Sequence, residues 1–472
     1  MFYGRGSELN RMNMLYESNE HQMVVIYGRR RVGKTSLINE FCKGKRTLFF
    51  SALESTAEGN LVALSKAINN FIHPHSSINS KYTTFDDAFK EIYEETQREK
   101  LVFVIDEFPY LASADRSISS VLQHAIDRMF SKTNIFMILC GSSMSFIEDQ
   151  VLGHNSPLYG RRTAQFKIEP LNYLEAAEAH PGISPETNAL IYGITGGVPH
   201  YINKLAVGTD SDLGNSVVEN LLERHCYLFE EPANLLKQEL REPATYNSLI
   251  ATMAGGAARL NEISNKTSLE YALCSKYISV LISLGIIGKK EPVCGRTKNK
   301  TLYFVKDNLF RFWYRFISDN MSLIMAGKAK LAYDLEIRPY LDHYMGITFE
   351  DICRQYLVYH ADVPFPIKVI GSWWGGNPET KVPEEIDILA VNGKNSIFGE
   401  CKWQSAPTDL AVLKGIKRKA ELFPEFDNKY YYLFSRSGFT SGVNKAAEED
   451  GSIRLITLTD IYNPRSAEDS PK

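Results

Sequence analysis

The sequence predicts an α/β protein that begins with a mostly parallel sheet, continues through helical segments and ends in a second, smaller α/β unit. Apolar runs at residues 23–27, 101–105 and 134–140 are typical of strands buried on both faces, and helical patterns separate them. Residues 170–240 then place apolar side chains at helical spacing, and residues 382–404 alternate with period two around an Asn-Gly pair.

Length and composition limit the class of protein. The chain has 472 residues, which is too many for one core and suggests about three domains. With a net charge of −3, any surface that binds nucleic acid must be local. The seven cysteines show no metal-ligand spacing, no apolar run approaches the ~18 residues of a membrane span, and the N-terminus lacks a signal pattern. We therefore expect a cytoplasmic protein with reduced thiols and no membrane partner.

The stretch 28–35, Gly-Arg-Arg-Arg-Val-Gly-Lys-Thr, joins the first predicted strand to a helix. It has the spacing G-x-x-x-x-G-K-T in the strand–loop–helix context of a phosphate-binding loop. Gly28 and Gly33 permit backbone conformations that turn N–H groups toward an anion, and the helix N-terminus adds its donors. Lys34 would bind the terminal phosphates, and Thr35 would ligate Mg²⁺. We predict that ATP binds here; the alternative is a glycine-rich turn without a ligand.

Polar side chains follow the next buried runs. Asp106 would hold Mg²⁺ through its water shell, and Glu107 would polarise the attacking water as a general base. The alternative is an acidic pair that caps a helix. A hydroxyl such as that of Ser142 could contact the γ-phosphate or orient the water. Two further loop residues are expected to contact the nucleotide, namely Arg31 and Ser36.

Two arginines, Arg161 and Arg162, lie on a glycine turn. One of them could act as a finger that stabilises charge during phosphoryl transfer, either within the chain or on a neighbour in a homo-oligomer. The alternative is a pair of ordinary surface arginines. Residues 171–240 are predicted to form a helical lid in which Pro199 approaches the nucleotide base, with a plain helix–helix turn as the even alternative.

Residues 241–320 are predicted to form three helices followed by a hairpin, which is winged-helix order. The hairpin is basic, which suits phosphate contacts on DNA. Its basic residues are Lys289, Lys290, Arg296, Lys298 and Lys300. The alternative is a solvated hairpin whose helices only contact other domains. Residues 321–340 are predicted to be a helical connector.

The late hairpin at 382–404 carries a second group of charged residues. A two-residue loop would place Glu385 opposite Glu400, whereas a four-residue loop would place Asp387 opposite Glu400. Either register puts these carboxylates and Lys402 on one face.

Carboxylates that face one another favour a bound Mg²⁺ or Mn²⁺, and Glu350 on an upstream helix could add a ligand. The ion could activate water for attack on a phosphodiester, with Lys402 positioning that water. A following helix, 408–423, is predicted to point its basic residues outward. These are Lys414, Lys417, Arg418 and Lys419. The alternative is the charged solvent face of an edge hairpin.

Residues 1 to about 320 resemble the archaeal-type P-loop ATPases near the AAA+ and STAND groups. The resemblance rests on the segments 28–35, 105–107, 141–143, 158–162 and 196–199. Residues 341–463 resemble the PD-(D/E)xK nuclease-like domain, with Asp387, Glu400 and Lys402 at the motif positions and Ile386 in place of the usual proline.

The resemblance implies a definite domain order. It comprises an ATPase core (1–170), a lid (171–240), a winged helix (241–320), a connector (321–340), a restriction-endonuclease-like domain (341–463) and a tail (464–472). We therefore expect a switch that binds and hydrolyses ATP with Mg²⁺ and carries a metal-dependent nuclease-like domain acting on DNA or RNA. The rival is a non-catalytic, ATP-gated DNA- or protein-binding regulator whose last domain only recognises a partner. A small-molecule kinase is a weaker third alternative, because no acceptor pocket is evident.

Overall fold

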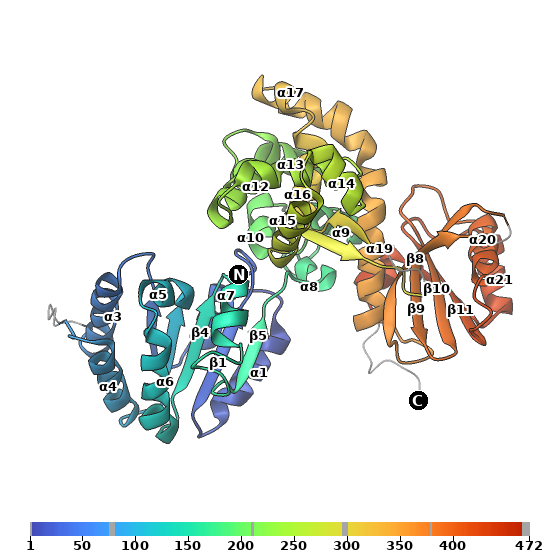
Figure 1. Ribbon diagram of the computed structural model, residues 1–472. Coiled ribbons are helices and arrows are strands. Elements are labelled where there is room, and N and C mark those ends of the chain that lie inside the picture. The colour runs from blue at the N-terminus through green and yellow to red at the C-terminus, as the bar shows by residue number, and fades with distance from the viewer. Residues whose placement is uncertain (1, 75–80, 209–211, 295–300, 378–379, 465–472) are drawn as a thin grey trace. The chain divides into compact units, whose positions relative to one another are not determined.

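The computed structural model describes residues 2–74, 81–208, 212–294, 301–377 and 380–464 (Figure 1). The chain forms two compact units: residues 1–171 with 198–200, and residues 172–197 with 201–472. The polypeptide therefore passes between the units three times, after residues 171, 197 and 200.

The first unit contains a five-stranded parallel sheet with the strand order β2-β3-β4-β1-β5. The strands are β1 (Gln22–Tyr27), β2 (Thr47–Ser51), β3 (Val102–Asp106), β4 (Phe136–Gly141) and β5 (Ala164–Lys167). The three central strands, β1, β3 and β4, are buried along their whole length, as their continuous apolar runs require. The predicted parallel sheet is confirmed, whereas the short, half-polar edge strand β5 was not predicted.

Helices cover both faces of this sheet. They are α1 (Gly6–Glu17), α2 (Lys34–Cys42), α3 (Ala57–Ile72), α4 (Phe85–Thr96), α5 (Phe108–Ala114), α6 (Ile118–Arg128) and α7 (Met144–Phe146), with the turns η1 (Phe130–Lys132) and η2 (Ile147–Val151). Alternate residues of β1 enter two separate cores, with Val24 in the core under α1 and α2 and Val25 in the core under α3 to α6. Because β4 lies between β1 and β3, the ends of all three strands meet at one edge.

Helices come next in the chain, and all but the first two residues of α10 belong to the second unit. They are α8 (Tyr173–Ala177), α9 (Pro185–Thr195), α10 (Pro199–Leu205), α11 (Leu213–Val217), η3 (Val218–Leu222) and α12 (Tyr227–Glu239). A helix–hairpin segment, residues 243–305, follows. It contains α13 (Pro243–Ala254), α14 (Leu260–Thr267), α15 (Tyr271–Ser283) and the antiparallel strands β6 (Ile287–Lys290) and β7 (Leu302–Val305). These elements share one apolar core, so the predicted order of three helices and a hairpin is present.

A run of helical segments then leads to the C-terminal sheet. It comprises α16 (Asn308–Phe312), η4 (Trp313–Ile317), α17 (Met321–Met325), α18 (Ala329–Ala332), η5 (Tyr333–Ile337), η6 (Arg338–Tyr340) and α19 (Leu341–Tyr359). The Tyr344 hydroxyl in α19 donates to the carbonyls of Gly193 (2.8 Å) and Asn308 (3.1 Å). Similarly, the Tyr173 hydroxyl donates to the Ile461 carbonyl at 2.8 Å. Residues 172–197 are thereby joined to the C-terminal part of the chain.

The C-terminal sheet is mixed, with the strand order β12-β11-β10-β9-β8. Its elements are β8 (Val369–Gly376), β9 (Pro383–Asn392), β10 (Asn395–Lys402), α20 (Leu410–Ala420), β11 (Asn428–Ser435), α21 (Ser441–Glu449), β12 (Ile453–Thr457) and α22 (Leu458–Tyr462). Strands β8, β9 and β10 pair antiparallel, whereas β10, β11 and β12 pair parallel. Strand β8, which contains three glycines, was not predicted.

The turn between β9 and β10 decides the register. Asn392 pairs with Asn395, and the ladder runs to Ile388 and Gly399. The turn is therefore shorter than the predicted four-residue loop, although its register is the one that aligns residue 387 with residue 400. Along the described ranges, no helix is both long enough and apolar enough to cross a membrane.

Candidate functional site

The loop between β1 and α2 is tightly bent. Gly28, Arg31 and Gly33 have φ angles of 155°, 73° and 94°. A Cβ at residue 28 would lie 2.3 Å from the Ile168 carbonyl oxygen, so only glycine fits there. These left-handed residues form the kind of concave backbone that binds phosphate groups.

Lys34 lies inside this loop. Its ammonium donates to the carbonyls of Gly28 (2.9 Å) and Arg29 (3.0 Å), and the residue is only 7% exposed. Burial lowers the pKa of Lys34, although the charges of Glu107 and Asp106 act in the opposite direction. The loop thus holds a cation that donates to two backbone carbonyls, which a phosphate group could replace.

The carboxylates after β3 meet the loop and the end of β4. The Thr35 hydroxyl lies 3.3 Å from Asp106 Oδ2, and the Glu107 N–H donates to Asp106 Oδ1 at 3.0 Å. Glu107 Oε2 accepts hydrogen bonds from the hydroxyl (3.0 Å) and the N–H (3.3 Å) of Ser142. The sheet order therefore brings together the predicted residues Lys34, Thr35, Asp106, Glu107 and Ser142.

The remaining predicted nucleotide contacts lie around the same loop. A Cβ on Gly33 would be 3.6 Å from Pro199 Cγ, so Pro199 is next to the loop, and the Tyr3 hydroxyl donates to its carbonyl at 3.3 Å. Ser36 is exposed in the first turn of α2, after Arg31 in the loop itself.

Sequence analysis did not identify Arg5 as a support of the loop. This residue is 6% exposed, and its guanidinium donates to the carbonyls of Val32 (3.3 Å) and Glu169.

The two predicted finger arginines have local partners. Arg161 makes a two-pronged ion pair with Asp127, with both N–O distances at 2.8 Å, and this hydrogen bonding lowers the pKa of Asp127. Arg162 donates to the Leu152 carbonyl at 3.3 Å and lies 5.9 Å from the Tyr159 ring centre. Arg161 would have to leave Asp127 to reach a nucleotide on another chain.

The second group of charged residues, here called the carboxylate centre, comprises Asp387, Glu400, Lys402 and Lys419. Asp387 Oδ2 accepts the Cys401 N–H at 2.9 Å, at the point where the β9–β10 ladder ends. Glu400 is 9% exposed and accepts from Lys402 at 2.8 Å on one oxygen and from Lys419 at 3.0 Å on the other.

Glu350 in α19 lies near this centre. Burial and, next, the charge of Asp387 raise the pKa of Glu350 to about 7, although Arg354 and Lys290 oppose the shift. Burial and the charge of Glu400 likewise raise the pKa of Asp387. For Lys402, burial is outweighed by the charge and hydrogen bond of Glu400, so its pKa rises.

The outward orientation predicted for the basic residues of α20 is wrong for Lys419. Its side chain is 17% exposed and turns toward Glu400. Lys419 flanks the buried stripe formed by Ile416 and Ala420, and its long stem lets the ammonium reach the sheet. Lys417 and Arg418 point outward as predicted, but they pair with Asp450 (2.7 Å) and Glu384 (2.5 Å).

The predicted metal ligands do not form a complete cage. Within the described parts of the chain, no group of three or more His, Cys, Asp or Glu side chains is arranged to hold a metal ion. The charge of Asp387 raises the pKa of Glu350, and the charge of Glu400 raises the pKa of Asp387, although the three carboxylates do not meet that condition. The pair Asp387 and Glu400 offers the hard oxygen ligands that Mg²⁺ or Mn²⁺ prefers, but two lysines already neutralise Glu400.

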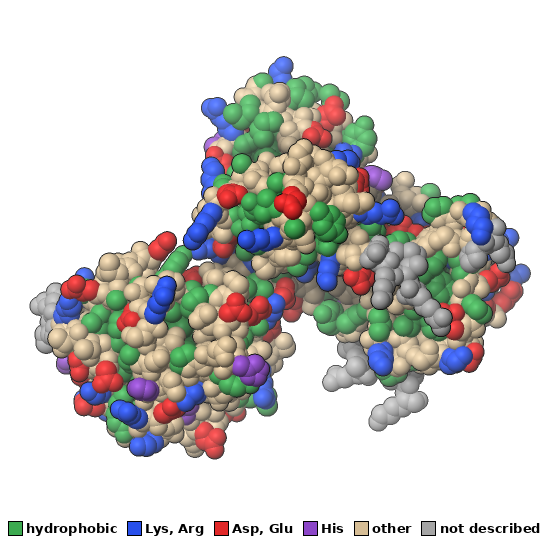
Figure 2. Space-filling model, viewed as in Figure 1, with side chains coloured by type: hydrophobic (Ala, Val, Ile, Leu, Met, Phe, Trp, Pro, Cys, Tyr) green, Lys and Arg blue, Asp and Glu red, His purple; other side chains and the backbone are tan. Residues whose placement is uncertain are grey.

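On the face shown in Figure 2, Lys and Arg side chains are interspersed with Asp and Glu. In the β6–β7 hairpin, Lys289 is exposed and Lys290 is half-buried. The predicted phosphate-binding residues Arg296, Lys298 and Lys300 lie outside the described residues, as does the tail from residue 465.

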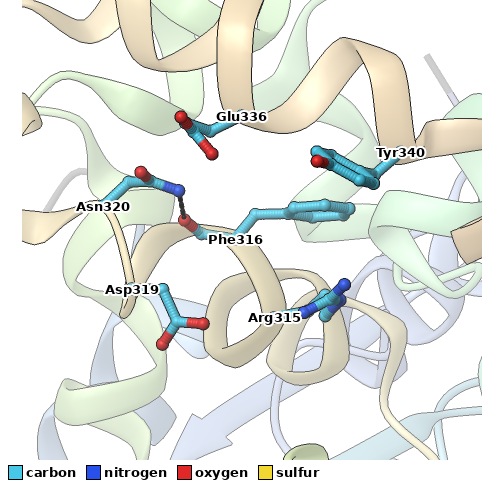
Figure 3. A pocket seen from close by; sticks show the side chains of 6 residues that line it. All are labelled: Arg315, Phe316, Asp319, Asn320, Glu336 and Tyr340. Carbon is cyan, nitrogen blue, oxygen red and sulfur yellow. Dashed lines mark hydrogen bonds between the residues drawn. The ribbon is translucent and has the colours of Figure 1, made fainter.

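A hollow of about 350 Å³ lies in the second unit (Figure 3). It is lined by Arg315, Phe316, Asp319, Asn320, Glu336 and Tyr340. In Figure 3 the Asn320 amide turns to the Phe316 carbonyl, to which it donates at 2.9 Å. None of these lining residues belongs to the phosphate-binding loop or to the carboxylate centre.

The parallel sheet, the phosphate-binding loop and the carboxylates after β3 define a P-loop ATPase. In agreement, residues 2–205 match a family described as an ATPase domain predominantly from Archaea. Residues 313–415 match a second family, described as archaeal and bacterial proteins of unknown function.

Individual proteins extend this similarity. The chain is 29% identical over 472 residues to the uncharacterised protein MJECL04 of Methanocaldococcus jannaschii, covering 98% of this chain and 100% of that protein. It is also 41% identical over 46 residues to the uncharacterised ATP-binding protein MJ0423 of that organism, covering 10% of this chain and 78% of that protein. The solved Walker-type ATPase PABY2304 of Pyrococcus abyssi has a similar fold, with a TM-score of 0.51 and 18% identity over 66% of this chain and 96% of that one. The solved structure shows a similar fold, whereas the match of residues 2–205 to the ATPase family supports ATP binding and hydrolysis by this chain.

Proposed function

We propose that this protein is an ATP-hydrolysing switch whose C-terminal part is a metal-dependent nuclease-like centre acting on nucleic acid. The observation that carries the second half of this proposal is the convergence of Asp387, Glu400 and Lys402 at the end of one hairpin ladder. Two acidic groups beside a lysine suit the positioning of water and of negative charge at a phosphodiester.

In the first unit, the backbone of Gly28, Arg31, Gly33 and Ser36 would surround the triphosphate, and Lys34 would exchange its carbonyl partners for phosphate oxygens. Mg²⁺, when bound beside Thr35 and Asp106, would neutralise phosphate charge. Glu107 would accept the proton of the attacking water, while Ser142 keeps its carboxylate oriented.

In the carboxylate centre, a divalent ion bound by Asp387 and Glu400 would supply the positive charge that polarises a phosphodiester. Lys402 would orient the attacking water or stabilise the developing charge. Glu350 would carry a proton near neutral pH, because its pKa is raised to about 7.

Other assignments complete the proposal. Residues 241–320 would be a winged helix, and residues 171–240 would act as a lid that brings Pro199 to the base. Arg161 or Arg162 would serve as the arginine finger, from the same chain or from a neighbour in a homo-oligomer.

The decisive experiment measures Mn²⁺- and Mg²⁺-dependent cleavage of DNA and RNA by the full chain, with and without ATP. We expect cleavage to be lost in Lys402→Ala and in Asp387→Asn but retained in Lys414→Ala, which removes an exposed lysine of α20. Equal cleavage by wild type and Lys402→Ala would overturn the nuclease assignment.

A second candidate function is a non-catalytic, ATP-gated regulator whose C-terminal part only binds a nucleic-acid or protein partner. It is favoured by the two lysines that hold both oxygens of Glu400 and compete with a metal ion. Binding of nucleic acid without cleavage in every metal and nucleotide state would support this candidate over the first.

A further inference from the structure

The edge strand of the C-terminal sheet has an irregularity at the place where another segment meets it. Strand β8 pairs with β9 on one side, and its register shifts between Gly371 and Trp373. The intervening Ser372 is 5% exposed, and its carbonyl accepts the Val293 N–H at 3.1 Å. Val293 follows the end of β6 in the helix–hairpin segment, so this backbone hydrogen bond joins the hairpin to the sheet edge.

The side chains around residues 293 and 371 pack closely where the hairpin meets β8. A Cβ at Gly371 would lie 2.9 Å from Val293 Cγ2, so a side chain at residue 371 would fit only if this γ-carbon moved or was removed. Val293 and Cys294 pack on the C-terminal apolar core, as Trp373 does. The absence of a side chain at residue 371 is therefore explained by the approach of Val293 rather than by backbone conformation.

The end of β6 also brings charge to the C-terminal sheet. The ammonium of Lys290 lies 5.4 Å from the ring centre of Trp374 in β8, a cation–π distance. Lys290 is also one of the cations whose charge acts on Glu350. Thus the basic end of the hairpin faces the sheet and the neighbourhood of the carboxylate centre.

We propose that residues 290–294 are an intramolecular docking segment for the β8 edge, so that the β6–β7 hairpin supports the carboxylate centre and does not bind nucleic acid. An unpaired sheet edge accepts an added strand, and covering it protects it from other chains. The docking of residues 290–294 on β8 is argued from geometry alone. The proposal that the hairpin supports the carboxylate centre rests on the proposed function of that centre.

Cysteine pairs test the docking. In a Cys294→Ser background, Val293→Cys with Gly371→Cys should form a disulfide when oxidised glutathione accepts the two thiol electrons. Val293→Cys with Gly376→Cys is the matched control, because among the described residues no atom beyond the chain neighbours lies within 4 Å of a Cβ at residue 376. We expect about fivefold more cross-link in the 293/371 pair, because disulfides need Cβ atoms about 4 Å apart. Equal yields would overturn the docking.

The same cross-linked protein tests the supporting role. ATP hydrolysis and binding of a labelled DNA duplex should be the same, within about twofold, in the oxidised and reduced 293/371 protein, because docking is the working state. A loss of DNA binding by about tenfold or more on oxidation would show that the hairpin must leave the edge, and would overturn the proposal. If neither form binds nucleic acid, the proposed function fails, while the cross-link yield still decides the docking.

A second variant covers the case in which the double cysteine protein does not fold. Val293→Asp should release the hairpin and make trypsin cleave after Lys289 or Lys290 about fivefold faster than in wild type. Val382→Asp, at an exposed valine, is the matched control. Unchanged cleavage in folded Val293→Asp would overturn the docking.

Discussion

The Ser142 hydroxyl donates to the Glu107 carboxylate across 3.0 Å, and each residue stands at the end of a different strand. Glu107 has a left-handed φ of 52° and begins helix α5. The direction of its carboxylate is therefore fixed by a neighbouring strand as well as by its own backbone.

Replacing this glutamate tests its role as the base. Glu107→Gln should lower kcat for ATP hydrolysis by about 10²–10⁴-fold, because the amide cannot accept the water proton. ATP affinity should change little, because Lys34 and the loop remain. Ser142→Ala should cost less, about tenfold, because only an orienting hydrogen bond is lost. Steady-state hydrolysis and nucleotide titration measure both. Glu148→Gln, at a surface ion pair with Lys167, is the control, and wild-type hydrolysis by Glu107→Gln would contradict the assignment.

The loop geometry predicts different effects at two glycines with positive φ. Gly28→Ala should abolish ATP binding and lower Tm, because its Cβ would lie 2.3 Å from a carbonyl oxygen. Gly44→Ala, at φ 71° in open space, should cost only about 1–2 kcal/mol of backbone strain. Thermal unfolding with and without ATP distinguishes them. Equal behaviour of the two variants would contradict the role given to the Ile168 contact.

The raised pKa of Glu350 predicts how stability depends on pH. The folded protein keeps this proton up to about pH 7, whereas the unfolded chain releases it near its ordinary value of 4.5. The folded state therefore binds more protons in this window, and the free energy of unfolding falls as pH rises through it. Glu350→Gln should remove the part of this fall that Glu350 contributes, which is on the order of 3 kcal/mol.

Tryptophan fluorescence during urea unfolding measures this effect, because all four tryptophans (Trp313, Trp373, Trp374 and Trp403) lie in the second unit. Glu336→Gln, at an exposed glutamate of η5, is the control. A Glu350→Gln variant with the same pH slope as wild type would show that this carboxyl titrates normally.

Lys419 should stabilise the second unit more than its exposed neighbours on α20. Lys419→Ala leaves one oxygen of the buried Glu400 without its partner, so the free energy of unfolding should fall by about 1–3 kcal/mol. Lys414→Ala should change it by about 0.5 kcal/mol or less, because its side chain is exposed. Urea unfolding compares the two, and equal effects would argue against the bond to Glu400.

Arg436 should join helices α9 and α19 to the segment that contains Trp403. Its guanidinium donates to Asp342 and Glu186, both at 2.6 Å, and lies 5.1 Å from the Trp403 ring centre. Arg436→Lys should lose one of the two carboxylates and cost about 1 kcal/mol, because both acids are half exposed. Urea unfolding followed by tryptophan fluorescence measures the change. A lysine variant as stable as wild type would mean that the two hydrogen bonds of the Arg436 guanidinium do not stabilise the fold.

Local patterns explain which parts of the fold could be predicted. The loop at 28–35 and the buried strands β1, β3 and β4 could be predicted, because a contiguous motif or a contiguous apolar run defines each of them. Strand β8 escaped prediction because its three glycines resemble a turn, and it is held in place by pairing with β9. Similarly, β5 is an edge strand of four residues with polar side chains at alternate positions.

Some contacts of the candidate site could also be predicted from the sequence, whereas others could not. The approach of Asp106 to Thr35 follows from topology, since ends of neighbouring parallel strands meet. The pairing of Arg161 with Asp127, and of Lys419 with Glu400, depends on side chains far apart in the sequence. Helical spacing could show that Lys419 flanks the buried stripe, but not which acid it meets.

The return of residues 198–200 to the first unit has a practical consequence for dissecting the molecule. No single cut in the polypeptide separates the two units with all their parts. A fragment ending at residue 171 would lack Pro199, which lies next to Gly33 and accepts a hydrogen bond from Tyr3. Genetic truncation would therefore remove Pro199 from beside the phosphate-binding loop. The two units are better studied by point substitution within the intact polypeptide.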